Sequence, residues 1–121
     1  MPNTTGSKSK KNRIALEDSN SVKNMRNAGA ILLCLTNTSE FCMWIESRNL
    51  HYGISKNPYN LSKIVGGSTG GEGGLISACG SLVGIGGDLA GSIRIPGKYL
   101  QDQIWHSKCY ISLLNWHIQN L

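Results

Sequence analysis

Residues 66–96 decide the fold of this 121-residue chain, and they read GGSTGGEGGLISACGSLVGIGGDLAGSIRIP. Eleven of the chain's 15 glycines fall in this stretch, between Gly66 and Gly91. A flexible glycine–serine linker has no reason to carry apolar residues. Here they recur throughout, at Leu75, Ile76, Ala78, Leu82, Val83 and Ile85. The pattern therefore predicts a compact core in which backbones approach closely and some residues adopt positive φ.

Upstream of this stretch, the sequence alternates between a helical and an extended pattern. Asp18 or Ser19 can cap a helix that runs to about Asn27, and Gly29 can end it. Residues 30–35 form a continuous apolar run, which predicts a buried strand. A helix, a glycine and then a buried strand are typical of an α/β protein. Residues 36–59 predict a short helix followed by a loop, and residues 61–65 are a brief apolar stretch.

The overall composition indicates a globular protein and argues against a nucleic-acid partner. Hydrophobic residues make up 40% of the chain, which is too many for a disordered segment. The net charge is +5, with a cluster near the start formed by Lys8, Lys10, Lys11 and Arg13. No aromatic residues interleave with this cluster, so a solvated loop is favoured over a surface that stacks bases.

The four cysteines and the hydropathy pattern give expectations about location. None of the cysteines forms a C-x-x-C pair, which argues against a zinc ribbon. Thiols in apolar surroundings behave as small hydrophobes, so we expect reduced cysteines and an intracellular protein. The first residues do not resemble a signal peptide, and no run approaches the roughly 20 apolar residues of a membrane span.

Residues 66–96 resemble the amidase signature almost residue for residue. That signature reads close to GGSSGGEG, then an apolar helix of small residues, then G-x-G-[ST]-D-x-G-G-S-I-R-x-P. Residues 36–67 and the start of the chain are similar to fatty-acid amide hydrolases of animals. The resemblance implies an α/β fold with a mixed β-sheet core covered by helices. Residues 1–96 would be a partial amidase-signature domain that lacks the upstream lysine strand and the C-terminal part.

The resemblance also implies roles for individual residues. Ser92 matches the nucleophile and Ser68 the bridging serine, while the third catalytic residue is a lysine on a strand outside this chain. The backbone of Leu89, Ala90, Gly91 and Ser92 matches the oxyanion hole, and Asp88 and Arg94 flank that turn. The family's peptide bond before the bridging serine is cis, which here is Gly67–Ser68.

This combination of residues suits hydrolysis of an amide bond. A serine hydroxyl is a weak nucleophile that must pass its proton to a base, and a desolvated lysine can be that base in its neutral form. The oxygen anion of the tetrahedral intermediate needs converging N–H donors. By resemblance, the substrate is a small-molecule lipid amide, with no metal or organic cofactor. Attachment of the whole protein to a membrane would depend on regions outside this chain.

Four positions near the site carry expectations of their own. Ala90 replaces the usual glycine and would be strained if that position needs positive φ. Thr69 replaces a second serine but keeps a hydroxyl, whereas Gly87 replaces a serine or threonine and loses one. Met43 could line an acyl pocket, although core packing is an equal alternative.

Three other interpretations compete with this one. The glycine-rich stretch lacks the Gly-Lys-Ser/Thr ending of a P-loop, and its glycines are misplaced for a dinucleotide fingerprint. His51, His106 and His117 share no spacing with Ser92, which argues against a histidine-based triad. The strongest alternative is a catalytically inactive fragment. Residues 97–121 depart from the family pattern, and we expect them to be a translated intron or a shifted reading frame.

Overall fold

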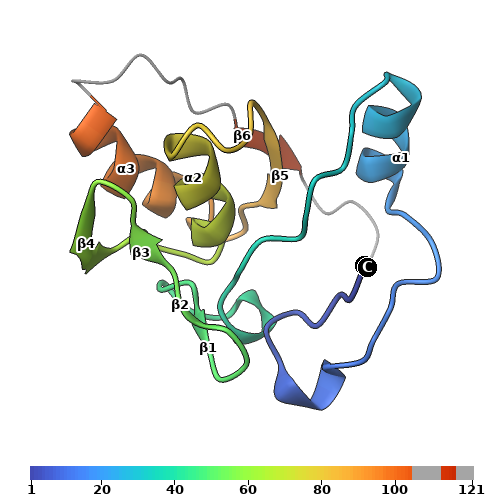
Figure 1. Cartoon of the computed structure of the whole chain (residues 1–121), viewed down its shortest axis with the longest axis horizontal. Coiled ribbons are helices and arrows are strands. Elements are labelled where there is room, and N and C mark those ends of the chain that lie inside the picture. Colours follow the sequence, from blue (N-terminus) through green and yellow to red (C-terminus); the bar gives the residue numbers. More distant parts are fainter. Residues whose placement is uncertain (105–112, 117–121) are drawn as a thin grey trace.

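The computed structural model describes residues 1–104 and 113–116. Around the signature it contains helix α2 (Gly70–Ser77), strand β5 (Gly84–Gly87), helix α3 (Arg94–Ile104) and strand β6 (Leu113–Trp116). The two helices lie side by side and β5 packs against α2 (Figure 1). β5 pairs with β6 in parallel, from Gly84 opposite Leu113 to Gly87 opposite Trp116.

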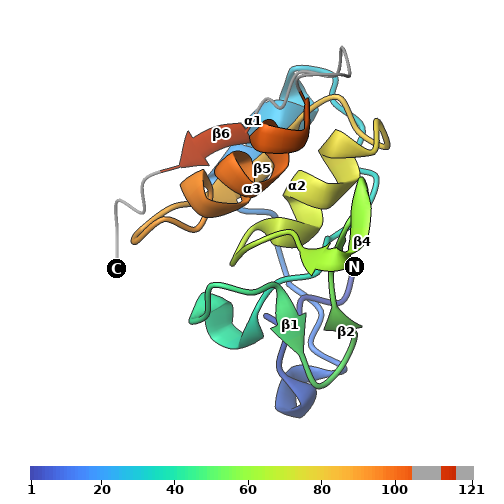
Figure 2. The same ribbon diagram turned by 90° about the vertical axis from the view of Figure 1, so that its left-hand side faces the viewer.

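The remaining strands form two small antiparallel hairpins. β1 (Arg48–Asn49) pairs with β2 (Gly53–Ile54), and β3 (Lys56–Asn57) pairs with β4 (Asn60–Ile64). The β1–β2 hairpin lies beside the N-terminal segment, at the end of the molecule away from α3 (Figure 2). The described residues thus have the α/β character that was expected, but their strands form three two-stranded sheets rather than one mixed sheet.

The core lies between α2 and α3. Its buried apolar side chains are Val65, Ile76, Ile93 and Leu100, joined by Pro96. Four of the eight residues of α2 are glycines, although glycine costs a helix interior about 1 kcal/mol relative to alanine. Close packing explains them: a Cβ on Gly73 would lie 2.8 Å from Leu100 Cδ1, and one on Gly71 would collide with the backbone of Asn37.

Two predictions about the N-terminal half have opposite outcomes. Helix α1 spans Asn20–Asn27 and Gly29 follows it, as predicted. Of the two candidate caps, Ser19 caps the helix through its side chain, and Gly29 has φ of 90°. The prediction of a buried strand at residues 30–35 is wrong. None of the three sheets contains these residues, and Ile31 is 84% exposed. A continuous apolar run predicts burial only where another element packs on it, and the described residues leave this run exposed.

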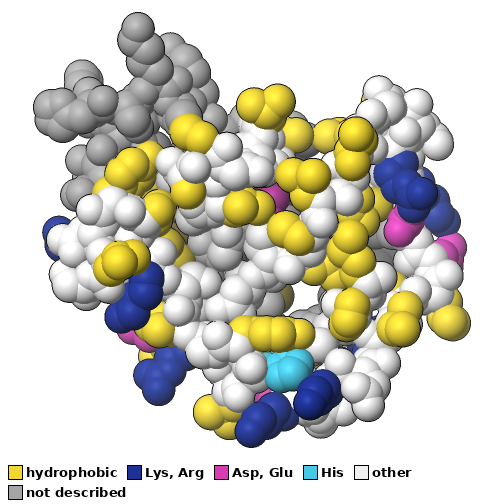
Figure 3. All heavy atoms as spheres, in the orientation of Figure 1, with side chains coloured by type: hydrophobic (Ala, Val, Ile, Leu, Met, Phe, Trp, Pro, Cys, Tyr) yellow, Lys and Arg dark blue, Asp and Glu magenta, His cyan; other side chains and the backbone are white. Residues whose placement is uncertain are grey.

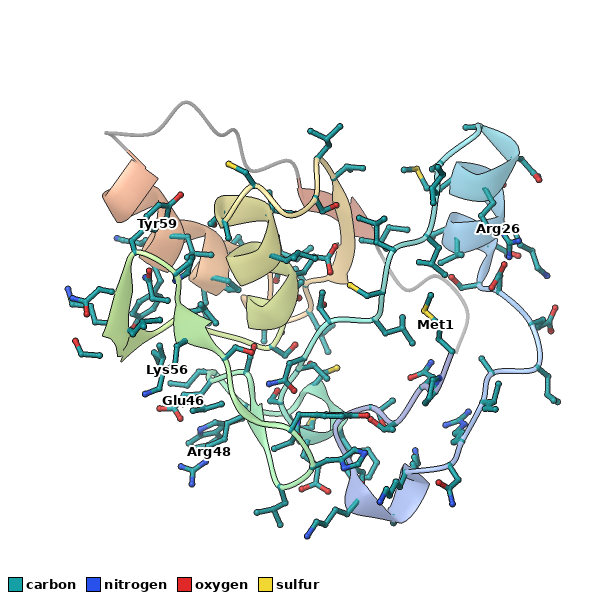
Figure 4. All side chains as sticks on the ribbon, viewed as in Figure 1. Met1, Arg26, Glu46, Arg48, Lys56 and Tyr59 are labelled. Carbon is teal, nitrogen blue, oxygen red and sulfur yellow. The ribbon has the colours of Figure 1, made fainter. Side chains whose placement is uncertain are left out.

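The segment between residues 36 and 59 is more structured than predicted. Its short helix is the 3-10 turn η2 (Glu40–Cys42), and a second 3-10 turn, η1 (Lys8–Lys10), lies near the start of the chain. The loop expected after η2 instead contains β1, β2 and β3, whose two-residue strands are too short to leave a periodic pattern. Figure 4 labels Glu46, Arg48 and Lys56 along this segment, on the side of the molecule away from α1.

The expected boundary at residues 96 and 97 falls inside α3. The helix continues to Ile104, and the fully buried Leu100 places one residue of the C-terminal tail (residues 97–121) in the core. Residues 105–112 and 117–121 lie outside the described residues, and the tail's origin as an intron or shifted frame stays a prediction. Cys79 is disulfide-bonded, which contradicts the expectation of reduced cysteines, whereas Cys34 and Cys42 are free. Within the described ranges, no helix is long and apolar enough to cross a membrane.

Candidate active site

Ser68 lies in a tight turn between β4 and α2. The peptide bond Gly67–Ser68 is cis, as the resemblance implies, and Gly66 has φ of 86°. Ser68 is only 4% exposed. A Cβ on Gly67 would lie 2.9 Å from the backbone carbon of Glu46, so a glycine is needed for this turn to pass the segment before β1. The sequence and the surrounding backbone together leave little freedom in the position of Ser68.

Ser92 lies in a second tight turn, just before α3. Gly91 has φ of 120°, which favours glycine, and the Gly91 carbonyl accepts a hydrogen bond of 2.7 Å from the Ile95 amide at the start of the helix. The two serine-bearing turns meet directly, because the Thr69 amide donates to the Ser92 carbonyl at 3.1 Å. The structure therefore brings together two residues that are 24 positions apart in the sequence (92 − 68). In the described part of the chain, no hydrogen bond links their hydroxyl groups.

The Asp88 carboxylate organises the turn that contains Ser92. It accepts hydrogen bonds from the amides of Gly91 (2.7 Å), Ile93 (3.1 Å) and Arg94 (3.0 Å). The Arg94 guanidinium adds two more, at 3.0 Å from Nε and 2.9 Å from Nη2. The Asp88 side chain is 1% exposed and that of Arg94 is 75% exposed. Arg94, with help from the three amides and against the effect of burial, holds the pKa of Asp88 well below its usual range.

The residues proposed to form the oxyanion hole lie in this same turn and differ in their exposure and hydrogen bonding. Leu89 is 91% exposed and Ala90 is exposed, while Ser92 is half-buried. The Gly91 amide points to Asp88, so in this structure it is engaged within the turn. Ala90 is absent from the non-glycine residues with positive φ among those described. An alanine at this position therefore brings no left-handed strain.

The other predicted residues lie around the two turns. Thr69 immediately precedes α2, and its methyl group packs on Gly86. A Cβ on Gly86 would lie 2.6 Å from Thr69 Cγ2. Gly87, at the end of β5, is exposed. Met43 follows η2 and is 80% exposed, which contradicts the alternative that it packs in the core. Its role in an acyl pocket stays a prediction.

A mostly apolar groove of about 820 Å³ lies between the N-terminal half and β5. Its lining includes Thr38, which donates to the Ser68 carbonyl, but no residue of either serine turn. Apolar side chains gather on the face of the molecule between α1 and α2 (Figure 3). Glu72 of α2 also lines the groove and accepts a hydrogen bond of 2.8 Å from Thr36 Oγ1. Burial raises the pKa of Glu72, and the hydrogen bond from Thr36 opposes this in part.

A set of buried and half-buried polar side chains beneath the Ser68 turn could not be found from the sequence. The Ser68 carbonyl accepts hydrogen bonds from Thr38 Oγ1 at 2.9 Å and from Ser47 Oγ at 3.0 Å. Asn37 Nδ2 donates to the Ser47 carbonyl, and Asn37 Oδ1 accepts a bond of 2.6 Å from Asn49 Nδ2. No local pattern marks these residues, since Ser47 acts on a partner 21 positions away.

The chain is similar in sequence to several proteins that are named as fatty-acid amide hydrolases. The chain is 52% identical to fatty-acid amide hydrolase 2-A of Danio rerio over 96 residues, covering 79% of this chain and 18% of that protein. It is 51% identical to fatty-acid amide hydrolase 2 of Homo sapiens over 99 residues, covering 82% and 19%. It is also 45% identical over 82 residues to fatty acid amide hydrolase 1 of Caenorhabditis elegans, covering 68% and 14%.

These curated relatives are much longer than this chain, which spans less than a fifth of their length. The sequence model of the family named Amidase matches residues 1–100, which is most of the chain. That range includes both serine turns, α2 and the hairpins beneath them. The chain belongs to the amidase family.

Proposed function

We propose that this chain carries the nucleophile and the bridging serine of an amide hydrolase, with Ser92 as the nucleophile and Ser68 as its proton relay. The observation that carries the proposal is the direct contact of the two turns through the Thr69 amide and the Ser92 carbonyl. It is supported by the low exposure of Ser68 and by relatives that are named as amide hydrolases.

In the proposed reaction, the Ser92 oxygen attacks the amide carbonyl and its proton passes to Ser68. Ser68 passes its own proton to a neutral lysine, which comes from outside the described residues. The proton then returns from the lysine through Ser68 to the amide nitrogen. Collapse of the tetrahedral intermediate expels a neutral amine and leaves an acyl ester on Ser92, which water hydrolyses to the free acid. N–H donors in the turn before Ser92 would stabilise the oxygen anion. The Gly91 amide joins them only if the turn reorients, because it donates to Asp88 here.

The proposed substrates are amides of long-chain fatty acids, which are small molecules with one polar end. The relatives named fatty-acid amide hydrolase support this class, and the apolar groove between the N-terminal half and β5 is consistent with it. The test is to compare hydrolysis of a long-chain primary fatty-acid amide with that of acetamide by the complete protein that the gene encodes. Equal kcat/KM values for the two would contradict a lipid amide substrate.

The nucleophile can be tested independently of the substrate. A fluorophosphonate probe should label the complete protein at Ser92, and Ser92→Ala should abolish the labelling. Ser68→Ala should slow labelling by about 10²–10⁴-fold, the usual contribution of a proton-transfer group. Ser62→Ala is the matched control, because Ser62 is an exposed serine of β4 that bonds only to Asn60 in the described structure. Labelling that survives Ser92→Ala unchanged would overturn the assignment.

A further inference from the structure

Ser47 is a fully buried serine whose hydroxyl makes two hydrogen bonds to the turn that holds Ser68. Its Oγ donates to the Ser68 carbonyl at 3.0 Å and accepts from the Gly70 amide at 2.7 Å. The residue is 1% exposed. One hydroxyl group therefore satisfies a carbonyl and an amide on either side of Thr69, in a place that bulk water does not reach.

The position of Ser47 is itself fixed by its backbone. Its amide donates to the Gly66 carbonyl at 3.1 Å, and its carbonyl accepts from the Ser55 amide at 2.9 Å. Asn37 Nδ2 adds a third contact to that carbonyl at 3.2 Å. The Ser47 hydroxyl is thus held in place by the backbone contacts of its own residue. It can therefore fix the position of the Ser68 turn.

Gly70 completes this arrangement. A Cβ at position 70 would collide with Ser47 Oγ and with Val65, so only glycine lets the start of α2 approach the hydroxyl this closely. Thr38 supplies a second donor to the Ser68 carbonyl, at 2.9 Å. Without the Ser47 hydroxyl, the Ser68 carbonyl would keep one donor, Thr38, but the buried Gly70 amide would lose its acceptor.

We propose that Ser47 is a positioning residue that holds the bridging serine at its working distance from Ser92. Its effect on the reaction rests on the proposed function. Few contacts connect Ser47 to Ser92. Ser47 bonds to Ser68 and Gly70, and the amide of Thr69, which lies between them, donates to the Ser92 carbonyl. Small displacements of a catalytic group cost about 10²-fold in rate when they reach about 1 Å. Because Ser47 touches neither reacting atom, its loss should lower kcat and leave KM nearly unchanged.

Ser39 provides a matched control. It is also fully buried, and its Oγ likewise bridges a carbonyl and an amide, donating to the Trp44 carbonyl at 3.1 Å and accepting from the Trp44 amide at 3.2 Å. Its hydroxyl makes these bonds within the 39–44 turn and, among the described contacts, none to Ser68. Ser39→Ala and Ser47→Ala therefore remove the same chemistry from two places, of which only one supports the Ser68 turn.

The experiment uses the complete protein in two arms. In the first, hydrogen–deuterium exchange is followed in peptides covering residues 66–74. We expect Ser47→Ala to speed exchange there by about tenfold or more, and Ser39→Ala to leave it unchanged. In the second, Ser47→Ala should slow fluorophosphonate labelling of Ser92 and lower kcat by about 10- to 100-fold, with KM within about twofold. Ser47→Thr, which keeps the hydroxyl, should recover most of the rate.

Each outcome decides the proposal. Equal exchange and equal kcat in Ser47→Ala and wild type would overturn it, as would equal losses in Ser47→Ala and Ser39→Ala. If wild type is not labelled at Ser92, the proposed function fails, and the exchange arm alone then decides whether Ser47 holds the turn. If Ser47→Ala does not fold, Thr38→Val replaces it, because it removes the other donor to the Ser68 carbonyl from a half-buried site.

Discussion

At the scale of single residues, Asp88 shows how one side chain can shape a turn. Five donors converge on its carboxylate, two from Arg94 and three from backbone amides that would otherwise lack partners at the start of α3. A carboxylate in this position satisfies the amides and carries the charge that they favour. Resemblance to the family places Asp88 and Arg94 beside the turn, but only the structure shows that Asp88 also accepts a hydrogen bond from the Gly91 amide.

The acid sensitivity of this turn follows from the pKa of Asp88. The folded-state pKa lies below the ordinary value of 3.8, so the ionised form contributes stability that is fully present above that value. This contribution is lost as the pH falls below about 4 and through the lower folded-state pKa. We predict that Asp88→Asn is less stable than wild type at pH about 7, and that the difference shrinks as the pH approaches about 2.

Urea unfolding midpoints across that pH range give the measurement. Asp18→Asn is the matched control, because Asp18 also pairs with an arginine, Arg26, at 2.6 Å but on the exposed surface. Exposed ion pairs contribute little, so this variant should differ from wild type by less than about 1 kcal/mol at any pH. A constant difference between Asp88→Asn and wild type over the whole range would contradict the assignment to Asp88.

At the scale of elements, structure set by neighbouring residues could be predicted from the sequence, whereas structure set by long-range packing could not. Helix α1 could be predicted because its cap, Ser19, and its terminating glycine, Gly29, are adjacent to it in the sequence. The exposure of residues 30–35 could not be predicted, since burial of an apolar run depends on which element packs on it. The strands of β1 and β2 are two residues long, too short for any periodicity to show.

The same distinction applies to the site. Ser68 and Ser92 could be proposed as site residues because each lies in a short glycine-rich motif that resembles the family signature. Ser47, Thr38 and Asn37 could not, because their importance comes from partners 21, 30 and 10 positions away, respectively. The packing role of individual glycines in α2 also needed coordinates, since nothing in GGEGG tells which glycine lies against a backbone and which has room for a Cβ.

Helix α2 allows that last point to be tested with two variants of the same chemistry. A Cβ on Gly71 would collide with the Asn37 backbone, whereas a Cβ on Gly74 would meet only Val65 Cγ1 at an ordinary 3.5 Å. Alanine favours the helix over glycine by about 1 kcal/mol at either position. We predict that Gly74→Ala raises the free energy of unfolding by up to about 1 kcal/mol, while Gly71→Ala lowers it by about 1–3 kcal/mol through overpacking.

Chemical denaturation of the two variants beside wild type measures both effects. Because the substitutions are identical and only three positions apart (74 − 71), differences in helix propensity cancel between them. If both variants are stabilised equally, the close approach between α2 and Asn37 does not exist in solution.

At the scale of the whole molecule, the distribution of apolar side chains is unusual for a globular chain. Large apolar residues on two segments stay exposed, one at residues 31–35 and one at residues 41–45. The buried apolar core of the described residues is by contrast small, with Val65, Ile76, Ile93 and Leu100 as its members. A small core gives marginal stability, because a short chain buries a smaller fraction of its surface on folding than a long one.

We predict that the 121-residue chain, purified alone, hydrolyses no amide above background. The proposed mechanism needs a neutral lysine, and desolvation is what keeps a lysine neutral. Every described lysine is exposed except Lys10, which is half-buried, and its ammonium lies 4.8 Å above the Phe41 ring. Without a base, proton transfer from Ser92 loses about 10²–10⁴-fold in rate.

The prediction is checked by fluorophosphonate labelling of the isolated chain beside the complete protein. We expect the isolated chain to give the signal of its own Ser92→Ala variant, and the complete protein to be labelled strongly. Circular dichroism of the isolated chain separates loss of fold from loss of the base, because a folded chain that is not labelled lacks only the base. Labelling of the isolated chain that disappears in Ser92→Ala would refute the prediction. A lysine within the chain would then be the base, and Lys63→Gln, on β4 just before the Ser68 turn, would be the first variant to examine.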